Sequence, residues 1–161
     1  MKDSMSEKGL LLIRRAIELS LESVKRGGGP FGAVIVKNGK IVSESYNQVT
    51  LHNDPTAHAE IGAIREAARK LNTFDLSGCS IYVSCEPCPM CLGAIYWARI
   101  DKVFFASTRS DAENIGFDDS FIYEEISRPM NERKIDFKQL LREEALEAFR
   151  AWEESENKIE Y

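Results

Sequence analysis

The chain has 161 residues, of which 43% are hydrophobic and 29% are charged. This composition is typical of a globular protein rather than a disordered or fibrous one, and the length fits one domain spanning residues 1–161. No run approaches the ~20 apolar residues of a membrane span, and the start MKDSMSEKG lacks the apolar centre of a signal peptide. We therefore expect a cytoplasmic protein without a membrane partner.

The net charge of −5 is concentrated at the carboxyl end, where residues 143–161 carry seven Glu against Arg150 and Lys158. The rest of the chain is balanced and has no basic stripe, which disfavours nucleic acid as a partner. The charge pattern of the tail itself is typical of a solvated acidic helix.

The hydrophobic pattern predicts an amino-terminal helix over residues 6–25, followed by a β-hairpin. The apolar stripe of this helix is Leu10, Ile13, Ile17, Leu21 and Val24. The hairpin joins strands 32–37 and 40–46 through Asn38-Gly39, a strong signal for a type I′ turn.

The remaining pattern alternates helices and strands and predicts a three-layer α/β domain with a mixed sheet. A second helix begins near Thr56, its expected N-cap, and ends at Leu71, with Ile61, Ile64, Ala68 and Leu71 as its buried stripe. The later elements are a strand over 80–85, a helix over 87–98, a strand over 103–107, a loop over 108–131 with a short helix near 119–126, a strand over 135–141 and a helix over 143–156.

Three of the four cysteines lie in the run SCEPCPMC, at Cys85, Cys88 and Cys91, and the fourth is Cys79. A ferredoxin-type iron–sulfur run requires another cysteine where Ile95 stands, which disfavours that cofactor. A thioredoxin-like dithiol at Cys88 and Cys91 stays open as an interpretation, but it does not account for the histidine and glutamate discussed next.

A closed zinc site could use His58 together with the three cysteines of this run. Cys85, however, ends the predicted strand, whereas Cys88 and Cys91 share the first turn of the next helix, where the helix dipole favours thiolates. We therefore expect Cys79 and Cys85 to be buried thiols, and one zinc ion per chain to be bound by His58, Cys88 and Cys91. Three protein ligands leave the fourth position open for water, which is the pattern of a catalytic zinc.

Glu60 lies two positions after His58, so the two side chains do not share a face of the helix. Glu60 is therefore poorly placed as a fourth ligand, but it can reach past the metal towards a bound water and a substrate. A carboxylate in that place can accept a proton and return it to a leaving group. We predict that Glu60 is the catalytic residue.

The string HAE at residues 58–60 followed by PCPMC at residues 87–91 resembles the H-x-E…P-C-x-x-C signature of the zinc nucleobase and nucleoside deaminases. PFGAVIVK, NDPTAHAE, CEPCPMCLGAIYWAR, GFDDSFIY and the terminal Glu160-Tyr161 are similar to strings of the bacterial guanine deaminases, over nearly the whole chain. The GFDDSF string and the last tyrosine matter most, because tRNA adenosine deaminases share the zinc motifs but have a different, usually basic, carboxyl end. The resemblance implies the cytidine-deaminase-like α-β-α fold.

The resemblance also implies which residues contact a purine: Phe31, Asn47, Ala59, Trp97, Asp119 and Tyr161. Phe31 and Trp97 would line the base pocket, and Asn47 and Asp119 would hydrogen-bond the base. In this family the carboxyl-terminal segment, here roughly residues 128–161, crosses to the partner in a domain-swapped homodimer, so Tyr161 would close the neighbouring site. The alternative is a tail that packs on its own sheet and frays at its end.

The activity that the resemblance implies is hydrolysis of guanine to xanthine and ammonia in purine catabolism or salvage, with zinc-bound hydroxide as nucleophile and Glu60 as proton shuttle. One alternative is a deaminase of another base, such as tRNA adenosine, cytosine or a related aminated heterocycle. A second alternative, from a different class, is a zinc-stabilised or thiol-redox binding protein without hydrolytic activity. That interpretation would leave Glu60 and Asp119 without a role.

Overall fold

The computed structural model describes residues 7–161, so Ser6, the first residue of the predicted amino-terminal helix, lies outside the described part. The chain divides into two units after Asp119, and each unit is described by itself. The elements of the first unit are α1 (Glu7–Lys25), β1 (Gly32–Lys37), β2 (Lys40–Tyr46), α2 (Val49–His52), α3 (Ala59–Leu71), β3 (Cys79–Cys85), α4 (Pro89–Trp97), β4 (Lys102–Ser107) and α5 (Arg109–Glu113).

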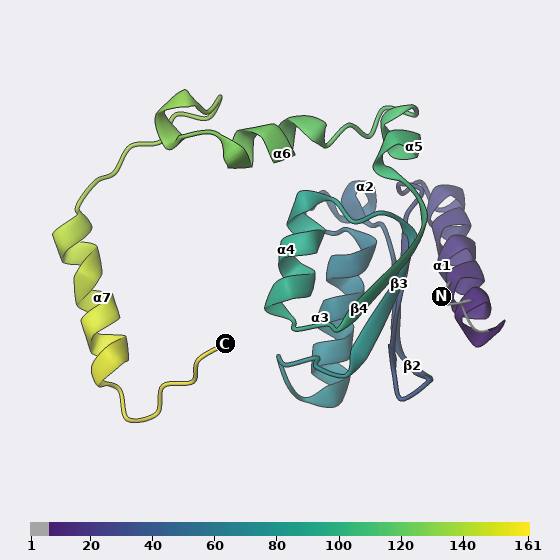
Figure 1. The fold of residues 1–161 in the computed structure, drawn as a ribbon, viewed down its shortest axis with the longest axis horizontal. Coiled ribbons are helices and arrows are strands. Elements are labelled where there is room, and N and C mark those ends of the chain that lie inside the picture. Colours follow the sequence, from purple (N-terminus) through teal and green to yellow (C-terminus); the bar gives the residue numbers. More distant parts are fainter. Residues whose placement is uncertain (1–6) are drawn as a thin grey trace, which may run out of the picture. The chain divides into compact units, whose positions relative to one another are not determined.

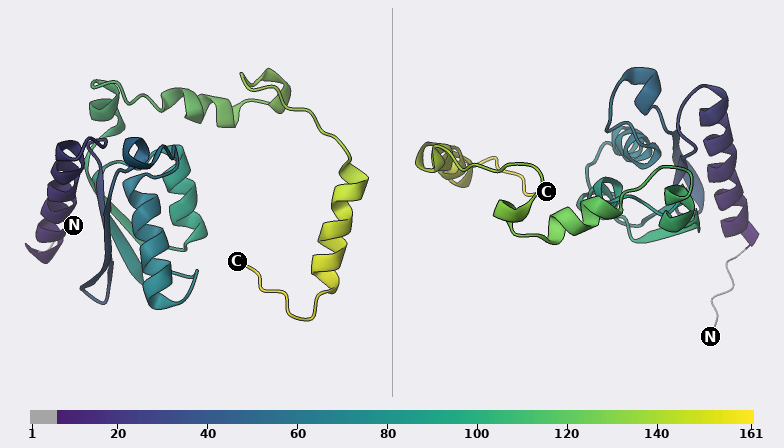
Figure 2. Two further views of the ribbon diagram at one scale, coloured as in Figure 1. Left: turned by 180° about the vertical axis from the view of Figure 1, so that it is seen from behind. Right: turned by 90° about the horizontal axis from the view of Figure 1, so that it is seen from above.

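The four strands form one mixed sheet in the order β2-β1-β3-β4. β1 is antiparallel to both of its neighbours, whereas β3 and β4 run parallel. Helix α1 covers one face of the sheet, and α3 and α4 cover the other (Figure 1). The views from behind and from above show the same separation (Figure 2). The predicted three-layer α/β architecture with a mixed sheet is confirmed.

The central strand β1 is buried on both faces, and its side chains divide the core in two. Ala33 and Ile35 pack in a cluster with residues of α3 and α4, whereas Val34 and Val36 pack with α1. Alternate residues of a strand point to opposite faces of the sheet, so one apolar strand supplies both clusters. The hairpin turn that follows has the predicted form, because Asn38 and Gly39 have φ values of 51° and 73°.

Helix α1 has the predicted extent within the described residues, but it buries a different face from the predicted one. Leu10, Ile17 and Leu21 of the predicted stripe are exposed, and the buried face consists of Gly9, Leu12, Ala16, Leu19, Ser20 and Ser23. The small residues allow the helix to approach β1 closely: a Cβ atom on Gly32 would collide with the Ala16 carbonyl and lie 2.8 Å from the Leu19 Cβ. Close approach therefore decides the buried face, and the pattern of large apolar residues does not reveal it.

Helix α3 begins three residues after the predicted Thr56 N-cap. The Asp54 carboxylate accepts hydrogen bonds from the Thr56 N–H at 2.8 Å and from its hydroxyl at 2.7 Å, which closes a turn before the helix and moves the N-cap to His58. Ile64, Ala68 and Leu71 of the predicted stripe pack against the core cluster but are only partly buried, and the fully buried residues of the helix are Ala59, Glu60, Ala63 and Ala67.

The second unit consists of α6 (Ser120–Ser127), a 3-10 helix (Met130–Glu132) and α7 (Arg142–Glu154). The predicted helix over 143–156 is confirmed as α7, but the predicted strand over 135–141 is wrong, because that segment is irregular. A strand needs a partner with free N–H and C=O groups, and the second unit contains no other strand. Neither α6 nor α7 buries any of its residues.

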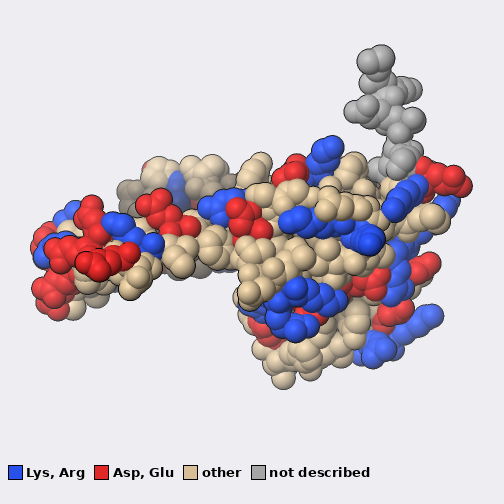
Figure 3. Space-filling view, turned by 90° about the horizontal axis from the view of Figure 1, so that it is seen from below, with Lys and Arg blue, Asp and Glu red and all other residues tan. Residues whose placement is uncertain are grey.

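The surface of the described chain carries its charges unevenly. Acidic side chains gather over the carboxyl-terminal helices, whereas Lys and Arg are interspersed with Asp and Glu over the first unit (Figure 3). No helix of the described residues has the length and apolar character that crossing a membrane requires.

Gly32→Ala should destabilise the fold by about 1–3 kcal/mol, because the added methyl group would push α1 away from β1. Gly93→Ala is the matched control, since a Cβ atom there meets nothing within 4 Å and helix α4 should gain roughly 0.5–1 kcal/mol. Urea unfolding of the two purified variants measures both changes. Equal midpoints for Gly32→Ala and the parent protein would contradict the close packing of α1.

Candidate metal centre and base pocket

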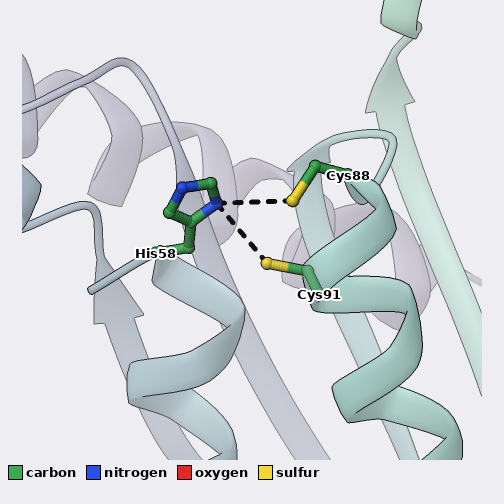
Figure 4. A group of neighbouring side chains, drawn as sticks. All are labelled: His58, Cys88 and Cys91. Carbon is green, nitrogen blue, oxygen red and sulfur yellow. Dashed lines mark hydrogen bonds between the residues drawn. The ribbon is translucent and has the colours of Figure 1, made fainter. Parts of the chain in front are cut away.

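His58, Cys88 and Cys91 meet between the amino-terminal ends of α3 and α4. His58 is the N-cap of α3, Cys88 is the N-cap of α4, and Cys91 lies in the first turn of α4. Pro89 suits this place, because the first position of a helix tolerates a residue without an N–H donor. The three side chains point towards one another from the two helix ends (Figure 4).

The spacing of these three side chains fits a tetrahedral zinc ion. The His58 Nδ1 atom lies 3.5 Å from both the Cys88 and the Cys91 Sγ atoms, and the three ligand atoms lie within 4.8 Å of one another. Tetrahedral Zn–S bonds of about 2.3 Å and Zn–N bonds of about 2.0–2.1 Å require N···S separations of about 3.5 Å. The two thiols and the imidazole are also the donor types that zinc prefers, so the residues fit this metal.

The hydrogen bond between the two cysteines shifts their pKa values in opposite directions. The Cys91 thiol and the His58 ring hydrogen-bond to the Cys88 sulfur and lower the pKa of Cys88 to about 4. The Cys88 thiolate in turn raises the pKa of Cys91 far above its usual value. A divalent cation between them favours the thiolate form of both residues.

Cys85 and Cys79 are buried free thiols outside this cluster. The Cys85 thiol donates to the Thr108 carbonyl oxygen at 3.5 Å, and its burial raises its pKa. Among the described residues, the group able to hold a metal consists of His58, Cys88 and Cys91. The strand-to-helix turn at Pro87 therefore separates Cys85 from the two cysteines that follow it.

Glu60 is buried beside the metal centre. Burial is the main cause that raises the pKa of Glu60, and the Cys88 charge raises it further, whereas a hydrogen bond with Cys91 lowers it. A carboxyl group whose pKa is raised by burial holds a proton more readily than an exposed one, which suits it to accept and return a proton. The structure thus places Glu60 next to the cluster without making it a member of the metal-binding group.

A second group of side chains surrounds the loop that leads into β1. The Asn47 N–H donates to the Phe31 carbonyl oxygen at 2.9 Å, and the Asn47 side chain is buried. The rings of Phe31 and Phe117 meet edge to face with centroids 5.0 Å apart. Phe117 was not among the predicted site residues, although it lies in the GFDDSF string, and only the folded chain shows its contact with Phe31.

Asp119 lies within electrostatic reach of Cys88. Burial is the main cause that raises the pKa of Asp119, and the Cys88 charge raises it further, whereas the Arg109 guanidinium lowers it. The preceding segment is held to the metal-site turn by Glu86, whose carboxylate accepts the Arg109 N–H at 3.1 Å and pairs with its guanidinium at 3.7 Å. Phe31, Asn47 and Asp119 thus lie in the unit that holds the metal centre.

Three other predicted contact residues have different surroundings. Ala59 packs in the apolar core under the sheet, so only its main chain is left for a ligand. Trp97, at the end of α4, is 67% exposed, and Tyr161, in the second unit, is 72% exposed. His52 is exposed at the end of α2.

Comparison with protein families identifies the centre. The family model of the cytidine and deoxycytidylate deaminase zinc-binding region matches residues 6–107. The chain belongs to this zinc-binding deaminase family. The matched residues include all three candidate ligands and Glu60, and a zinc ion is the metal that this family binds.

Individual relatives match a larger share of the chain than the family model does. The chain is 56% identical over 150 residues to a guanine deaminase of Bacillus subtilis, covering 92% of this chain and 96% of that protein. The crystal structure of the Bacillus subtilis guanine deaminase has a TM-score of 0.92 at 55% identity, covering 94% of this chain and 98% of that one.

Two further relatives differ in coverage. A structure of a guanine deaminase from Nitrosomonas europaea has a TM-score of 0.67 at 31% identity, covering 91% of this chain and 84% of that one. A tRNA-specific adenosine deaminase of Aquifex aeolicus is 46% identical over 95 residues, covering 59% of this chain and 63% of that protein.

Cys88→Ala and Cys91→Ala should each lose zinc, because each variant keeps only two of the three protein ligands and two ligands are too few to retain the ion. Cys85→Ala should retain it, since this thiol donates to a main-chain carbonyl outside the cluster. Metal analysis of the three purified variants checks this assignment. Zinc loss in the Cys85 variant alone would overturn it.

Proposed function

We propose that this protein is a zinc-dependent guanine deaminase, a hydrolase that converts guanine to xanthine and ammonia in purine catabolism or salvage. The observation that carries the proposal is the open His58–Cys88–Cys91 cluster with the buried Glu60 beside it. The likeness to a guanine deaminase over 92% of the chain supports guanine as the base.

In the proposed reaction His58, Cys88 and Cys91 hold one zinc ion per chain. Zinc in such a site lowers the pKa of a bound water towards ~7 and makes it a nucleophile at neutral pH. Glu60 accepts a proton of the attacking water and passes it to the ring nitrogen beside the reacting carbon. Glu60 then takes the remaining hydroxyl proton and gives it to the amino group, which leaves as ammonia. Protons are conserved, and Glu60 ends the cycle as it began.

The base is proposed to lie against Phe31 and Phe117, with Asn47 and Asp119 bonding its edges. The edge-to-face contact of the two rings and the burial of Asn47 support an apolar pocket with few polar groups, which suits a flat base. Ala59 would contribute through its main chain. Trp97 is proposed to line the pocket from the end of α4, where its side chain is exposed and can contact a ligand.

Glu60→Gln should retain zinc but lose about 10²–10⁴-fold in turnover, because an amide cannot accept and return the proton. Ammonia release from guanine measures the turnover, and metal analysis of the same preparation shows whether the centre is intact. Near-normal turnover by a zinc-loaded Glu60→Gln protein would remove Glu60 from the mechanism.

The test of the proposed substrate is a panel of guanine, adenine, cytosine and a tRNA containing the target adenosine, each assayed for ammonia release by the zinc-loaded protein. We expect turnover of guanine above the others. The tRNA adenosine deaminase of Aquifex aeolicus matches only 59% of this chain, and the net charge of −5 does not favour tRNA. Preferred turnover of another base would replace the proposal, and an inert zinc-loaded protein would favour a binding role.

We further propose that the whole chain acts as one deaminase domain whose segment of roughly residues 128–161 is exchanged within a homodimer. Leu140 is 80% exposed and Phe149 is 71% exposed, and α6 and α7 bury no residues. Apolar surface of this extent marks an interaction site, and exchange of identical elements is a low-cost route to a dimer. The outward face of α1 adds further apolar surface through Leu21 and Val24.

The proposed exchange predicts that two defective chains restore activity to each other. One chain carries Glu60→Gln and the other lacks Tyr161. In an exchanged dimer the intact Tyr161 of the first chain closes the site that contains the intact Glu60 of the second, so each mixed dimer has one complete site. Guanine turnover is measured after the two proteins are unfolded together and refolded, with each protein alone as control. No gain above the separate proteins would contradict the exchange.

We propose a cytoplasmic location, in line with the four free thiols, two of them in the metal centre. A reducing compartment keeps such thiols available to zinc, whereas an oxidising one favours disulfides.

A further inference from the structure

The side-chain oxygen of Asn47 is already occupied by two main-chain donors. The Oδ1 atom accepts hydrogen bonds from the Gly29 N–H at 3.3 Å and from the Val49 N–H at 3.2 Å. Both partners can only donate, so the atom that faces them must be the amide oxygen and not the nitrogen. The other end of the amide, the Nδ2 group, is a pure donor. The orientation of Asn47 is therefore set by the protein before any ligand binds.

The main chain of Asn47 is held as firmly as its side chain. The hydroxyl of Ser23, fully buried at the end of α1, donates to the Asn47 carbonyl oxygen at 2.8 Å. On the other side the Asn47 N–H donates to the Phe31 carbonyl oxygen at 2.9 Å. Ser23 itself is tied to the loop, because its carbonyl oxygen accepts the Gly28 N–H at 2.8 Å.

The glycines between α1 and β1 make this arrangement possible. A Cβ atom on Gly28 would collide with the Asn47 carbonyl and would lie 2.5 Å from the Ser23 hydroxyl oxygen. A Cβ atom on Gly29 would lie 3.2 Å from the Asn47 Cγ atom. The loop can thus pass close enough to deliver the Gly29 N–H to Asn47 only because it has no side chains there.

We infer that Asn47 meets the base solely as a hydrogen-bond donor, and that Ser23 and the glycines Gly28 and Gly29 are the positioning residues that fix this polarity. The inference rests on the proposed function in one respect, namely that Asn47 faces the base. The atom of the base opposite Nδ2 must then be an acceptor. Guanine offers N3, N7 and O6. A base that presents an N–H there is rejected, because two donors would face each other without a partner.

The donor role is tested by combining Asn47→Asp with base analogues. Aspartate keeps an oxygen for the Gly29 and Val49 N–H groups but replaces the donor by an acceptor. Guanine is compared with 3-deazaguanine and 7-deazaguanine, which lack the acceptors N3 and N7, and with 2-aminopurine, which lacks the acceptor O6 together with the N1 proton. The fourth analogue is 9-methylguanine, which lacks a donor. Dissociation constants are measured by calorimetry in zinc-loaded Glu60→Gln protein, so that guanine is not consumed.

Asn47→Asp should weaken guanine binding at least about tenfold, and this penalty should disappear for one of the three acceptor-lacking analogues. An equal penalty for all three analogues overturns the inference, as does a penalty that disappears only for 9-methylguanine. Failure of the zinc-loaded protein to bind guanine also overturns it. If the parent protein binds guanine but does not turn it over, the proposed function is refuted. The hydrogen-bond polarity of Asn47 can still be determined from the dissociation constants in that case.

The positioning role of Ser23 is tested by Ser23→Ala with Ser43→Ala as the matched control. Ser43 is also buried, and its hydroxyl donates to the Ala63 carbonyl oxygen at 2.7 Å, so the control removes the same kind of bond elsewhere in the core. The two variants should lose similar thermal stability. Only Ser23→Ala should raise the KM for guanine, by about tenfold, with kcat nearly unchanged. Equal KM values in the two variants would show that Ser23 is merely structural.

Discussion

The convergence of two helix ends on one point is the constraint on which the rest of the molecule depends. His58 and Cys88 are the N-caps of α3 and α4, so the metal centre exists only while the sheet holds both helices at a fixed separation. Helix α3 can lie close to the sheet because its inward residues are small, and a Cβ atom on Gly62 would collide with the Ser45 hydroxyl. The turn before α4 is anchored by the Glu86 N–H, which donates to the Ser107 carbonyl oxygen at 2.9 Å and extends the pairing of β3 with β4.

The same convergence places three acidic groups in a buried region. The hydrogen bond between the two cysteines shifts their pKa values in opposite directions, and the Cys88 charge adds to the burial that raises the pKa of Glu60. A divalent ion held by His58, Cys88 and Cys91 would favour the thiolate form of both cysteines. The burial of Glu60 is set by the fold and does not depend on that ion.

Local signals predicted the parts of the fold that local geometry determines. Asn38-Gly39 specifies a hairpin because both residues tolerate positive φ. The helix predicted from residue 87 instead begins at Pro89, after the N-cap Cys88, and it is Pro89 that occupies the first helical position. The zinc ligands could be chosen from the sequence because the cysteine spacing and the HAE string constrain the chemistry directly. The same reasoning rejected Cys85, whose place at the end of β3 separates it from the cluster.

Features that depend on how segments distant in the sequence pack together could not be predicted from local sequence signals. The buried face of α1 is set by the fit of Ala16 over Gly32, so the larger Leu10, Ile17 and Leu21 stay outside. Residues 135–141 have the composition of a strand, but the unit that contains them offers no strand to pair with. The contact of Phe31 with Phe117 joins residues far apart in the chain, and no periodicity in either segment indicates it.

The location of these segments suggests how one metal centre can serve relatives with different bases. The family model covers residues 6–107, which contain the zinc ligands, Glu60 and Asn47, and the tRNA adenosine deaminase of Aquifex aeolicus matches a similar share of the chain. Phe117 and Asp119 lie beyond that limit, in a part that the guanine deaminase of Bacillus subtilis matches as well. Under the proposed function, the shared part would supply the machinery of deamination. Phe117 and Asp119 would then be the side chains that differ with the base, while the metal ligands stay the same.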